Sequence, residues 1–160
     1  MDVVRRRGIE GSTVLEPGGG VGSIQLELLK EGAARSTVVE LSPGYEEVAA
    51  ELAKEAGVDD RIERHVADFA ADGVGDADIV VLHRVVCCYP DYERLLGAAA
   101  EKARRTLVFT YPPRNWASRA VFASLNLWMR VRGSDFRAFV HRPERMADVV
   151  GRADTDPAPL

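Results

Sequence analysis

A carboxylate followed by a glycine-rich turn is the first group of residues whose chemistry could bind a ligand. Glu16, Gly18, Gly20 and Gly22 follow the pattern E-x-G-x-G-x-G directly after the apolar segment STVL. Glycine lets the backbone turn sharply and lets a ligand come close, because no side chain stands in the way. The segment therefore predicts a ligand-binding turn, with a tight turn that binds nothing as the alternative interpretation.

The charge in this turn indicates which ligand it would take. The dinucleotide-binding pattern G-x-G-x-x-G would need a glycine at Ser23, so that pattern is incomplete. A carboxylate at Glu16 would repel a pyrophosphate and attract a cation. S-adenosylmethionine (SAM) carries a sulfonium and an ammonium group and no phosphate. We therefore predict SAM as the cofactor, and an NAD-dependent oxidoreductase stays as the less favoured alternative.

The hydrophobic pattern predicts the strands and helices that would position this turn. Strands are expected at 12–17, 36–41, 61–69, 77–86 and 106–112, with helices at 21–32, 42–56 and 92–103 and a long helix from Asn115. The charged run at 61–69 is typical of an edge strand, and the apolar run at 77–86 is typical of a central one. This alternation indicates a parallel α/β sheet, in which ligands bind beyond the carboxyl ends of the strands.

Two of these helices carry apolar residues at helical spacing. Val48 and Leu52 stand four residues apart and predict the buried face of the second helix. Phe122, Leu125 and Met129 predict a core-facing stripe on the long helix. The alternative is that the aromatic side chains of this later region hold a planar acceptor.

Four motifs between Thr13 and Val86 resemble, in order and spacing, those of the class I SAM-dependent methyltransferases. The resemblance implies a Rossmann-like fold. It also implies that Glu40, at the end of the second strand, accepts hydrogen bonds from both ribose hydroxyls of SAM, with Leu41 beside it in the cofactor site. NAD enzymes use an acid in a similar position, so Glu40 alone does not distinguish the two cofactors.

Two later motifs supply the rest of the implied cofactor site. Asp68 would bond the exocyclic amine of adenine and Phe69 would flank the ring, with a helix cap as the alternative role of Asp68. His83 would lie beside the methionine or sulfonium portion of SAM and is the candidate catalytic residue. A histidine satisfied within the core is the alternative for His83. No metal site is expected.

Three later segments, CCYPDYERLL, RTLVFTYPP and RAFVHRPERM, resemble the magnesium-protoporphyrin O-methyltransferases. That family shows His-Tyr-Pro after its fourth strand, where this chain has Cys88, Tyr89 and Pro90. The acid–base histidine of the family is therefore missing, and a porphyrin acceptor is not implied. Cys88 is expected to act as a small apolar residue, with a nucleophile as the alternative.

The composition predicts a single domain over 1–150 and a flexible tail over 151–160. The chain has 160 residues, 46% of them hydrophobic, and a net charge of −4. The acidic balance argues against a nucleic-acid partner, and the arginines within 116–131 argue against a membrane span. The first residues lack the apolar segment of a signal peptide, and the two cysteines are adjacent, which gives no disulfide framework. A cytoplasmic location is therefore expected.

Class I methyltransferases usually carry helices before the glycine strand and an antiparallel hairpin at the end of the sheet. Here about a dozen residues precede Val14, and the prolines after 151 do not favour a strand. We therefore expect an α/β three-layer sandwich with five strands in the order 3-2-1-4-5 and no such hairpin. Its open edge at Thr106–Tyr111 could be covered in a homodimer.

Taken together, these residues predict a SAM-dependent methyltransferase that acts on a small-molecule acceptor, at oxygen or nitrogen. The reaction would depend mainly on positioning, because the sulfonium already makes the methyl group a good electrophile. The alternative is a SAM-binding protein without turnover, incomplete at both ends relative to the family.

Overall fold

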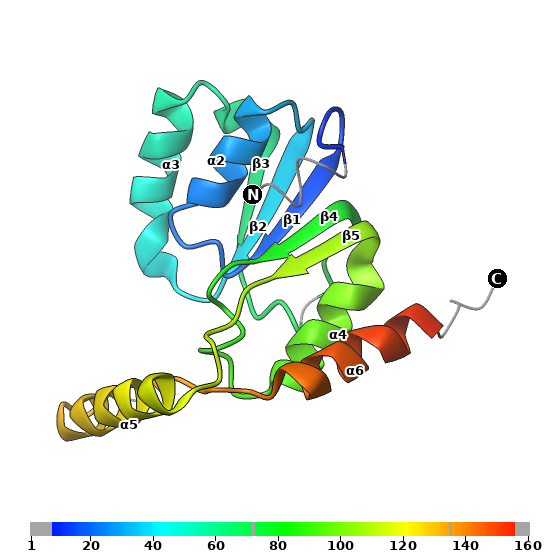
Figure 1. Cartoon of the computed structure of the whole chain (residues 1–160). Coiled ribbons are helices and arrows are strands. Elements are labelled where there is room, and N and C mark those ends of the chain that lie inside the picture. Colours follow the sequence, from blue (N-terminus) through cyan, green and yellow to red (C-terminus); the bar gives the residue numbers. More distant parts are fainter. Residues whose placement is uncertain (1–7, 72, 135, 156–160) are drawn as a thin grey trace.

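The protein folds around a five-stranded parallel sheet in a computed structural model that describes residues 8–71, 73–134 and 136–155. The strands have the order β3-β2-β1-β4-β5 (Figure 1). They are β1 (Thr13–Pro17), β2 (Arg35–Glu40), β3 (Ile62–Val66), β4 (Ala77–Leu82) and β5 (Ala103–Phe109). All four neighbouring pairs are parallel, so the predicted strand order is confirmed.

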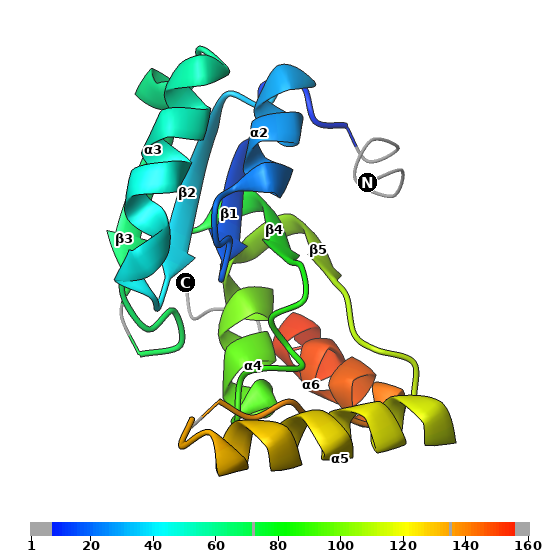
Figure 2. The ribbon, with the colours of Figure 1, turned by 90° about the vertical axis from the view of Figure 1, so that its left-hand side faces the viewer.

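Helices cover both faces of this sheet and give the predicted three layers. The helices α2 (Ser23–Lys30) and α3 (Glu46–Glu55) lie on one face, and α4 (Tyr92–Lys102) and α6 (Pro143–Thr155) lie on the other (Figures 1 and 2). Successive strand residues point to opposite faces, and both faces are apolar. In β1, Val14 packs with Leu28 of α2, whereas Leu15 packs with Leu96 of α4.

The α3 helix buries different residues from those expected. Ser42 begins the segment, because its hydroxyl oxygen accepts a hydrogen bond from the amide of Gly44 in the short 3-10 helix Pro43–Tyr45. The buried residues of α3 are Ala49 and Ala53, whereas Val48 is 47% exposed. The prediction that Val48 faces the core is wrong. The buried face therefore runs through Ala49 and Ala53, four residues apart, and Val48 lies next to that face.

Three strands end earlier than the apolar pattern predicted. The β3 strand ends at Val66, and the amide of Ala67 then donates to the carbonyl oxygen of Glu40. The β4 strand ends at Leu82, and the following residues form a turn instead of continuing the strand. The β5 strand begins before the expected Thr106 and ends at Phe109. These early ends leave loops at the carboxyl edge of the sheet, where a site can form.

The α5 helix (Trp116–Val131) lies outside the three layers (Figure 2). None of its residues is buried, and Trp116 is 83% exposed. Its polar anchor is Asn126, whose side chain donates to the carbonyl oxygen of Ala138 and accepts from the amide of Ala138, both at 2.8 Å. The prediction that α5 carries a core-facing stripe is therefore wrong. None of its apolar residues belongs to the two buried clusters that pack on the sheet.

The last helix and the edge strand of the sheet bear on two further expectations. The α6 helix continues to Thr155, so residues 151–155 of the expected tail are helical, and 156–160 lie outside the described residues. The β5 strand is an edge of the sheet, as expected. Within the described residues, no helix combines the length and the apolar character that crossing a membrane requires.

Candidate functional site

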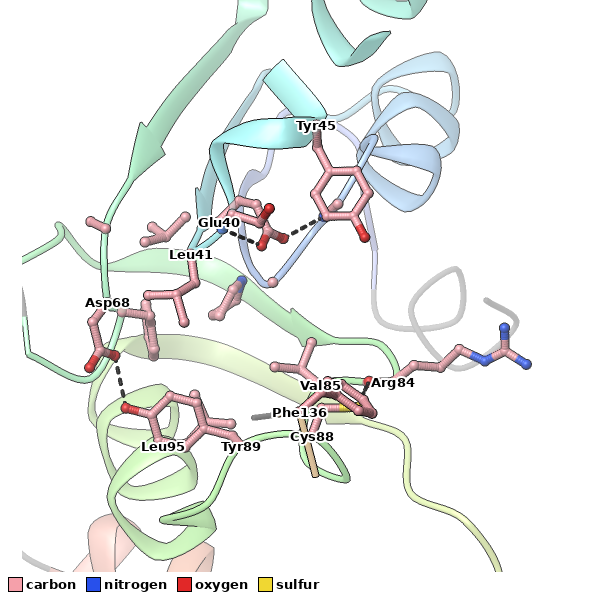
Figure 3. Close-up of a pocket in the computed structure, with 17 residues that line it drawn as sticks. Glu40, Leu41, Tyr45, Asp68, Arg84, Val85, Cys88, Tyr89, Leu95 and Phe136 are labelled. Atoms are coloured by element: carbon pink, nitrogen blue, oxygen red, sulfur yellow. Dashed lines mark hydrogen bonds between the residues drawn. The ribbon is translucent and has the colours of Figure 1, made fainter. Parts of the chain in front are cut away.

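A pocket of about 520 Å³ opens beyond the carboxyl ends of the strands. This is the edge at which parallel α/β sheets bind ligands, and the volume suits a small molecule. Figure 3 shows the 17 residues that line it. They are Pro17, Gly18, Gly20, Val39, Glu40, Leu41, Ser42, Tyr45, Ala67, Asp68, Phe69, Arg84, Val85, Cys88, Tyr89, Leu95 and Phe136.

The glycine turn forms one side of the pocket because only glycine fits there. Gly18 has a φ of 66°, and a Cβ at this position would lie 2.6 Å from Cγ2 of Val85. Its amide donates to the carbonyl oxygen of Val39 at 2.7 Å. Gly20 also has a positive φ, 54°, but a Cβ there would meet open space. The turn is thus closely packed at Gly18 and open to the pocket at Gly20.

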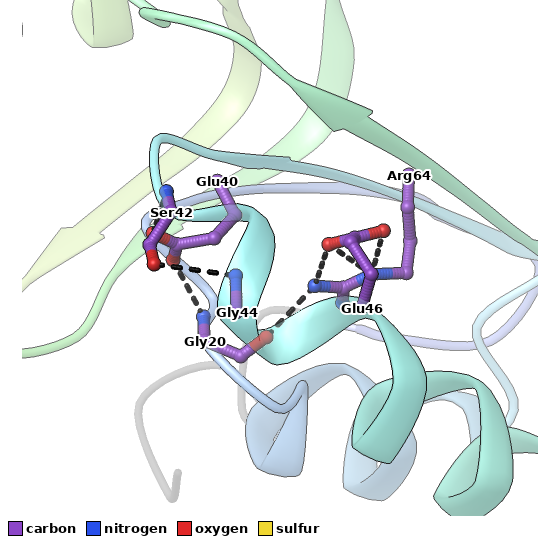
Figure 4. Close-up of polar contacts among 6 residues, drawn as sticks. All are labelled: Gly20, Glu40, Ser42, Gly44, Glu46 and Arg64. Atoms are coloured by element: carbon purple, nitrogen blue, oxygen red, sulfur yellow. Dashed lines mark hydrogen bonds and ion pairs between the residues drawn. The ribbon is translucent and has the colours of Figure 1, made fainter.

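Glu40 is held in the pocket wall by two backbone amides (Figure 4). Its Oε2 accepts from the amide of Gly20 and its Oε1 accepts from the amide of Ser42, both at 2.9 Å. The guanidinium of Arg64 donates to the carbonyl oxygen of Gly20 and forms an ion pair with Glu46, both at 2.8 Å. Each carboxylate oxygen can accept more than one hydrogen bond, so Glu40 keeps acceptor capacity for a ligand.

Asp68 and Tyr89 form the opposite polar contact of the pocket. The Tyr89 hydroxyl donates to Oδ1 of Asp68 at 2.8 Å, and the amide of Ala70 donates to the same oxygen at 3.1 Å. Asp68 therefore lines the pocket and caps a turn, and because no helix begins there, the alternative role as a helix cap is not observed. Burial and the bond to Asp68 raise the pKa of Tyr89 to about 12. Phe69, beside Asp68, is buried and presents an apolar surface to the pocket.

Glu16 does not line the pocket, contrary to the sequence-based expectation. Its side chain is 2% exposed and accepts a hydrogen bond from the backbone amide of Gln25, in α2. Its Oε2 is buried without a hydrogen-bond partner among the described residues, and a Cβ on Gly19 would lie 3.0 Å from it. Burial raises the pKa of Glu16 to about 8. The argument that its negative charge selects a cationic ligand is therefore wrong.

Two other predicted site residues also lie outside the pocket lining. Gly22 precedes α2 with a φ of 85°, and a Cβ there would meet the side chain of Gln25. His83 is exposed, and its Nδ1 lies 3.4 Å from the hydroxyl of Thr110. The structure brings together Gly18, Gly20, Glu40, Leu41, Asp68 and Phe69 from the predicted set.

The sequence pattern missed several lining residues that come from turns. Tyr45 lies in the short helix after β2, and Phe136 follows α5. Arg84 has a φ of 62°, unusual for a residue with a side chain, and its amide donates to the Thr110 hydroxyl at 2.9 Å. A residue held in such a conformation is often part of a functional site. The Pro43–Gly44 pair before Tyr45 is a turn signal, but no pattern marks Arg84 or Phe136.

Comparison with known proteins agrees with this geometry. Residues 15–106 match the family model described as a methyltransferase domain. No curated protein matches the chain. The structure of magnesium protoporphyrin IX methyltransferase from Synechocystis PCC 6803, with bound S-adenosylhomocysteine (SAH), gives a TM-score of 0.74 at 22% identity. The similarity covers 94% of this chain and 67% of that one.

Two further structures share the fold over almost the whole of this chain. An O-methyltransferase family protein from Burkholderia thailandensis gives a TM-score of 0.73 at 21% identity, covering 96% of this chain and 49% of that one. An O-methyltransferase family 2 protein from Planctomyces limnophilus DSM 3776, in complex with apigenin, gives 0.70 at 24% identity, covering 91% and 44%. This chain thus spans about two-thirds of the first structure and less than half of these two.

The family match extends over more than half of the chain and includes the end of β1, the glycine turn, β2, β3 and β4. The strand order and the position of the pocket agree with it. The expectation from the sequence motifs is confirmed at the level of the family: this chain belongs to the methyltransferase domain family.

Proposed function

We propose that this protein binds SAM in the pocket and transfers its methyl group to an oxygen or nitrogen of a small-molecule acceptor. One observation carries the proposal. Glu40 ends β2, Asp68 follows the neighbouring strand β3, and both line the same pocket as the open glycine turn at Gly20. The family match supports SAM over a dinucleotide, a choice that no longer depends on Glu16.

The lining residues fit the adenosine part of SAM. Glu40 would accept hydrogen bonds from the ribose hydroxyls, because each of its oxygens retains a lone pair beyond its backbone donor. Asp68 would accept from the adenine amine, and Phe69 and Leu41 would cover the ring with apolar surface. When bound, SAM supplies an electrophilic methyl group on a positively charged sulfur.

The chain itself contributes positioning and little proton transfer. None of the described lining residues is a histidine or a lysine. The raised pKa of Tyr89, about 12, keeps its hydroxyl protonated at neutral pH, where it orients Asp68. The acceptor would therefore enter as a competent nucleophile, or lose its proton to solvent or to a lining carboxylate. Alignment of two reactants can by itself supply roughly 7–11 kcal/mol of the barrier.

A second candidate function is SAM binding without turnover. Cys88 stands in the pocket wall where the magnesium-protoporphyrin family has its acid–base histidine. His83, the candidate catalytic residue, is not among the lining residues. This candidate differs from the first in one measurable property, which is the absence of methyl transfer to any acceptor while the cofactor still binds.

Calorimetry with SAH tests the cofactor site. We expect Glu40→Ala to weaken SAH binding by about 100-fold, because hydrogen bonds to a charged group are each worth roughly 1.5–3 kcal/mol. Glu51→Ala, which removes an exposed carboxylate of α3, is the matched control and should leave binding unchanged. Equal binding by Glu40→Ala and the parent, or displacement of SAH by NADH, would contradict the proposed site.

Turnover is tested with SAM that carries a labelled methyl group. Incubation with a panel of phenols, carboxylic acids and amines should label at least one small molecule if the first candidate holds. SAH binding together with no labelled product from the whole panel would favour the second candidate.

We further propose a cytoplasmic homodimer that covers the β5 edge, which runs through Leu107 and Val108. Both side chains are half-buried in one chain, so pairing would remove further apolar surface from water. Sedimentation equilibrium should give a dimer mass at micromolar concentration, and a monomer mass throughout would contradict it. Fractionation of cells that express the tagged chain tests its location.

A further inference from the structure

The turn after β4 places two thiols side by side, and one of them, Cys88, lines the pocket. Sγ of Cys87 and Sγ of Cys88 lie 3.5 Å apart, and both lie near the carbonyl oxygen of Arg84, at 3.4 and 3.7 Å. Cys88 lines the pocket, between Val85 and Tyr89 in sequence. Cys87 is half-buried and Cys88 is exposed, so both sulfurs can be reached by a small reagent.

This turn is fixed by backbone hydrogen bonds on both sides. The amides of Cys88 and Tyr89 donate to the carbonyl oxygen of Val85 at 2.8 and 3.1 Å. The carbonyl oxygen of Cys87 accepts from the amide of Phe139 at 2.7 Å. The two sulfurs are thus held at their spacing by the fold, which lowers the entropy cost of binding one atom between them.

The spacing indicates which kind of atom could bind both sulfurs. With bonds of about 2.3 Å, the usual length to a thiolate, one central atom would span 3.5 Å at an angle of about 100°. Linear two-coordination would need about 4.6 Å, twice that bond length. The geometry therefore favours a pyramidal or tetrahedral centre over a linear one.

The surroundings narrow the choice further. Among the described residues there is no group of three or more His, Cys, Asp or Glu side chains that could hold a metal ion. A closed tetrahedral zinc site would need four ligands. A trivalent arsenic atom that already carries one carbon substituent needs only two thiolates and is pyramidal, so it fits this pair.

We propose that Cys87 and Cys88 form a dithiol site for a monosubstituted trivalent arsenical, and that its occupancy closes the cofactor pocket beside Tyr89. In the reaction, R–As=O and two thiols give R–As(S–Cys)2 and one water. Two As–S bonds form, the As=O bond is lost, both thiol protons leave with the oxygen, and nothing is oxidised or reduced. A hydrogen bond from the Cys88 thiol lowers the pKa of Cys87 to about 7, which supplies the attacking thiolate at neutral pH.

Titration of the reduced full chain with phenylarsine oxide tests the dithiol. These are the two cysteines of the chain, so a count of free thiols reports on this pair alone. We expect one arsenical per chain by intact mass, loss of both free thiols, and reversal by a dithiol reagent. Cys87→Ser and Cys88→Ser, each checked for an unchanged thermal unfolding temperature, should bind at least 100-fold more weakly, because one of the two linked contacts is lost.

Two results would overturn the dithiol. One is stoichiometric binding by either serine variant with the affinity of the parent. The other is a parent whose two thiols stay free at one equivalent of reagent. If a serine variant does not fold, the corresponding alanine variant replaces it in the same titration.

The closure of the pocket rests on the proposed function and has its own measurement. Calorimetry should show SAH binding at least tenfold more weakly to the arsenical-loaded chain than to the free chain, and recovery after dithiol treatment. Equal SAH affinity in both forms would overturn closure. A free chain that binds no SAH would overturn the proposed function and closure together, while the thiol count would still decide the dithiol.

Discussion

The wall of the pocket formed by β1, β2 and β3 and the wall formed by the segments after β4 and α5 are held by different means. In the first wall, backbone amides fix Glu40, and the Arg64–Glu46 ion pair supports the carbonyl of Gly20. In the second wall, the turn after β4 provides Arg84 and Cys88, and the segment after α5 provides Phe136. The first wall is built for one ligand geometry, whereas the second consists of segments that can differ without disturbing the sheet.

This difference agrees with a division of labour between cofactor and acceptor. A cofactor shared by a whole family needs a fixed set of donors and acceptors, which a sheet edge supplies. Acceptors differ between enzymes, and loops carried on a rigid scaffold provide that variation. The predictions below test whether the two walls do differ in rigidity.

The largest expected effect concerns Glu16, beneath the first wall. Its pKa is raised from 4.5 to about 8 in the fold, so the contribution of Glu16 to stability is fully present below pH 4.5 and is lost as pH rises to 8. At 1.36 kcal/mol per pKa unit, the parent should lose about 4 kcal/mol between pH 5 and pH 9 from this group. Urea unfolding at both pH values measures the loss.

Glu16→Gln removes the titrating group and serves as the comparison. The amide can still accept the backbone hydrogen bond of Gln25. Between pH 5 and pH 9, the unfolding free energy of this variant should therefore fall by about 4 kcal/mol less than that of the parent. Parallel pH profiles for the two proteins would show that Glu16 is ionised within the fold.

Gly18→Ala has the next largest expected effect, because Gly18 in the first wall packs against Val85 in the second wall. The added Cβ would lie 2.6 Å from Val85, and the φ of 66° is unfavourable for alanine. We expect a loss of about 2–4 kcal/mol in stability and SAH binding weakened more than tenfold. Unfolding by urea and calorimetry measure the two effects.

Gly57→Ala is the matched control for that substitution. Gly57 has nearly the same φ, 65°, but a Cβ there would meet open space. It should cost about 1 kcal/mol from backbone strain and leave SAH binding unchanged. Equal losses of stability and of SAH binding in the two alanine variants would contradict the claim that Gly18 is needed for close packing of the turn against the second wall.

Trp116→Ala, in α5, has the smallest expected effect. Its side chain is 83% exposed, so we expect a change below about 0.5 kcal/mol in the free energy of unfolding. Leu96→Ala, in the buried face of α4, should cost about 2–5 kcal/mol by comparison. Similar losses for the two variants would mean that α5 packs as part of the core.

The sequence allowed the sheet and most of the first wall to be predicted. Apolar periodicity and glycine punctuation set the element order, and strand ends placed Glu40 and Asp68 at one edge. Glu16 was misplaced because side-chain direction depends on strand parity. In β1, Val14 faces α2, so Glu16 two residues later faces α2 as well and meets Gln25. That parity was readable in the sequence.

The second wall could not be predicted in the same way. An apolar run does not show where a strand stops, so the strand was expected to continue to residue 86 although it ends at Leu82. The contact of Phe136 with the pocket depends on how α5 is carried by Asn126, which is a tertiary interaction with no local signal. Loops gain their positions from such contacts and not from periodicity.

The most direct test of the cofactor site is an amide NMR titration of the chain with SAH. We predict that the amide of Gly20, which donates to Glu40, and the amide of Leu41 shift with one common dissociation constant. The amide resonance of Gly57, a residue outside the pocket lining, should not shift. Shifts that spare Gly20 and Leu41, or no shifts at saturating SAH, would contradict the assignment of this pocket to the cofactor.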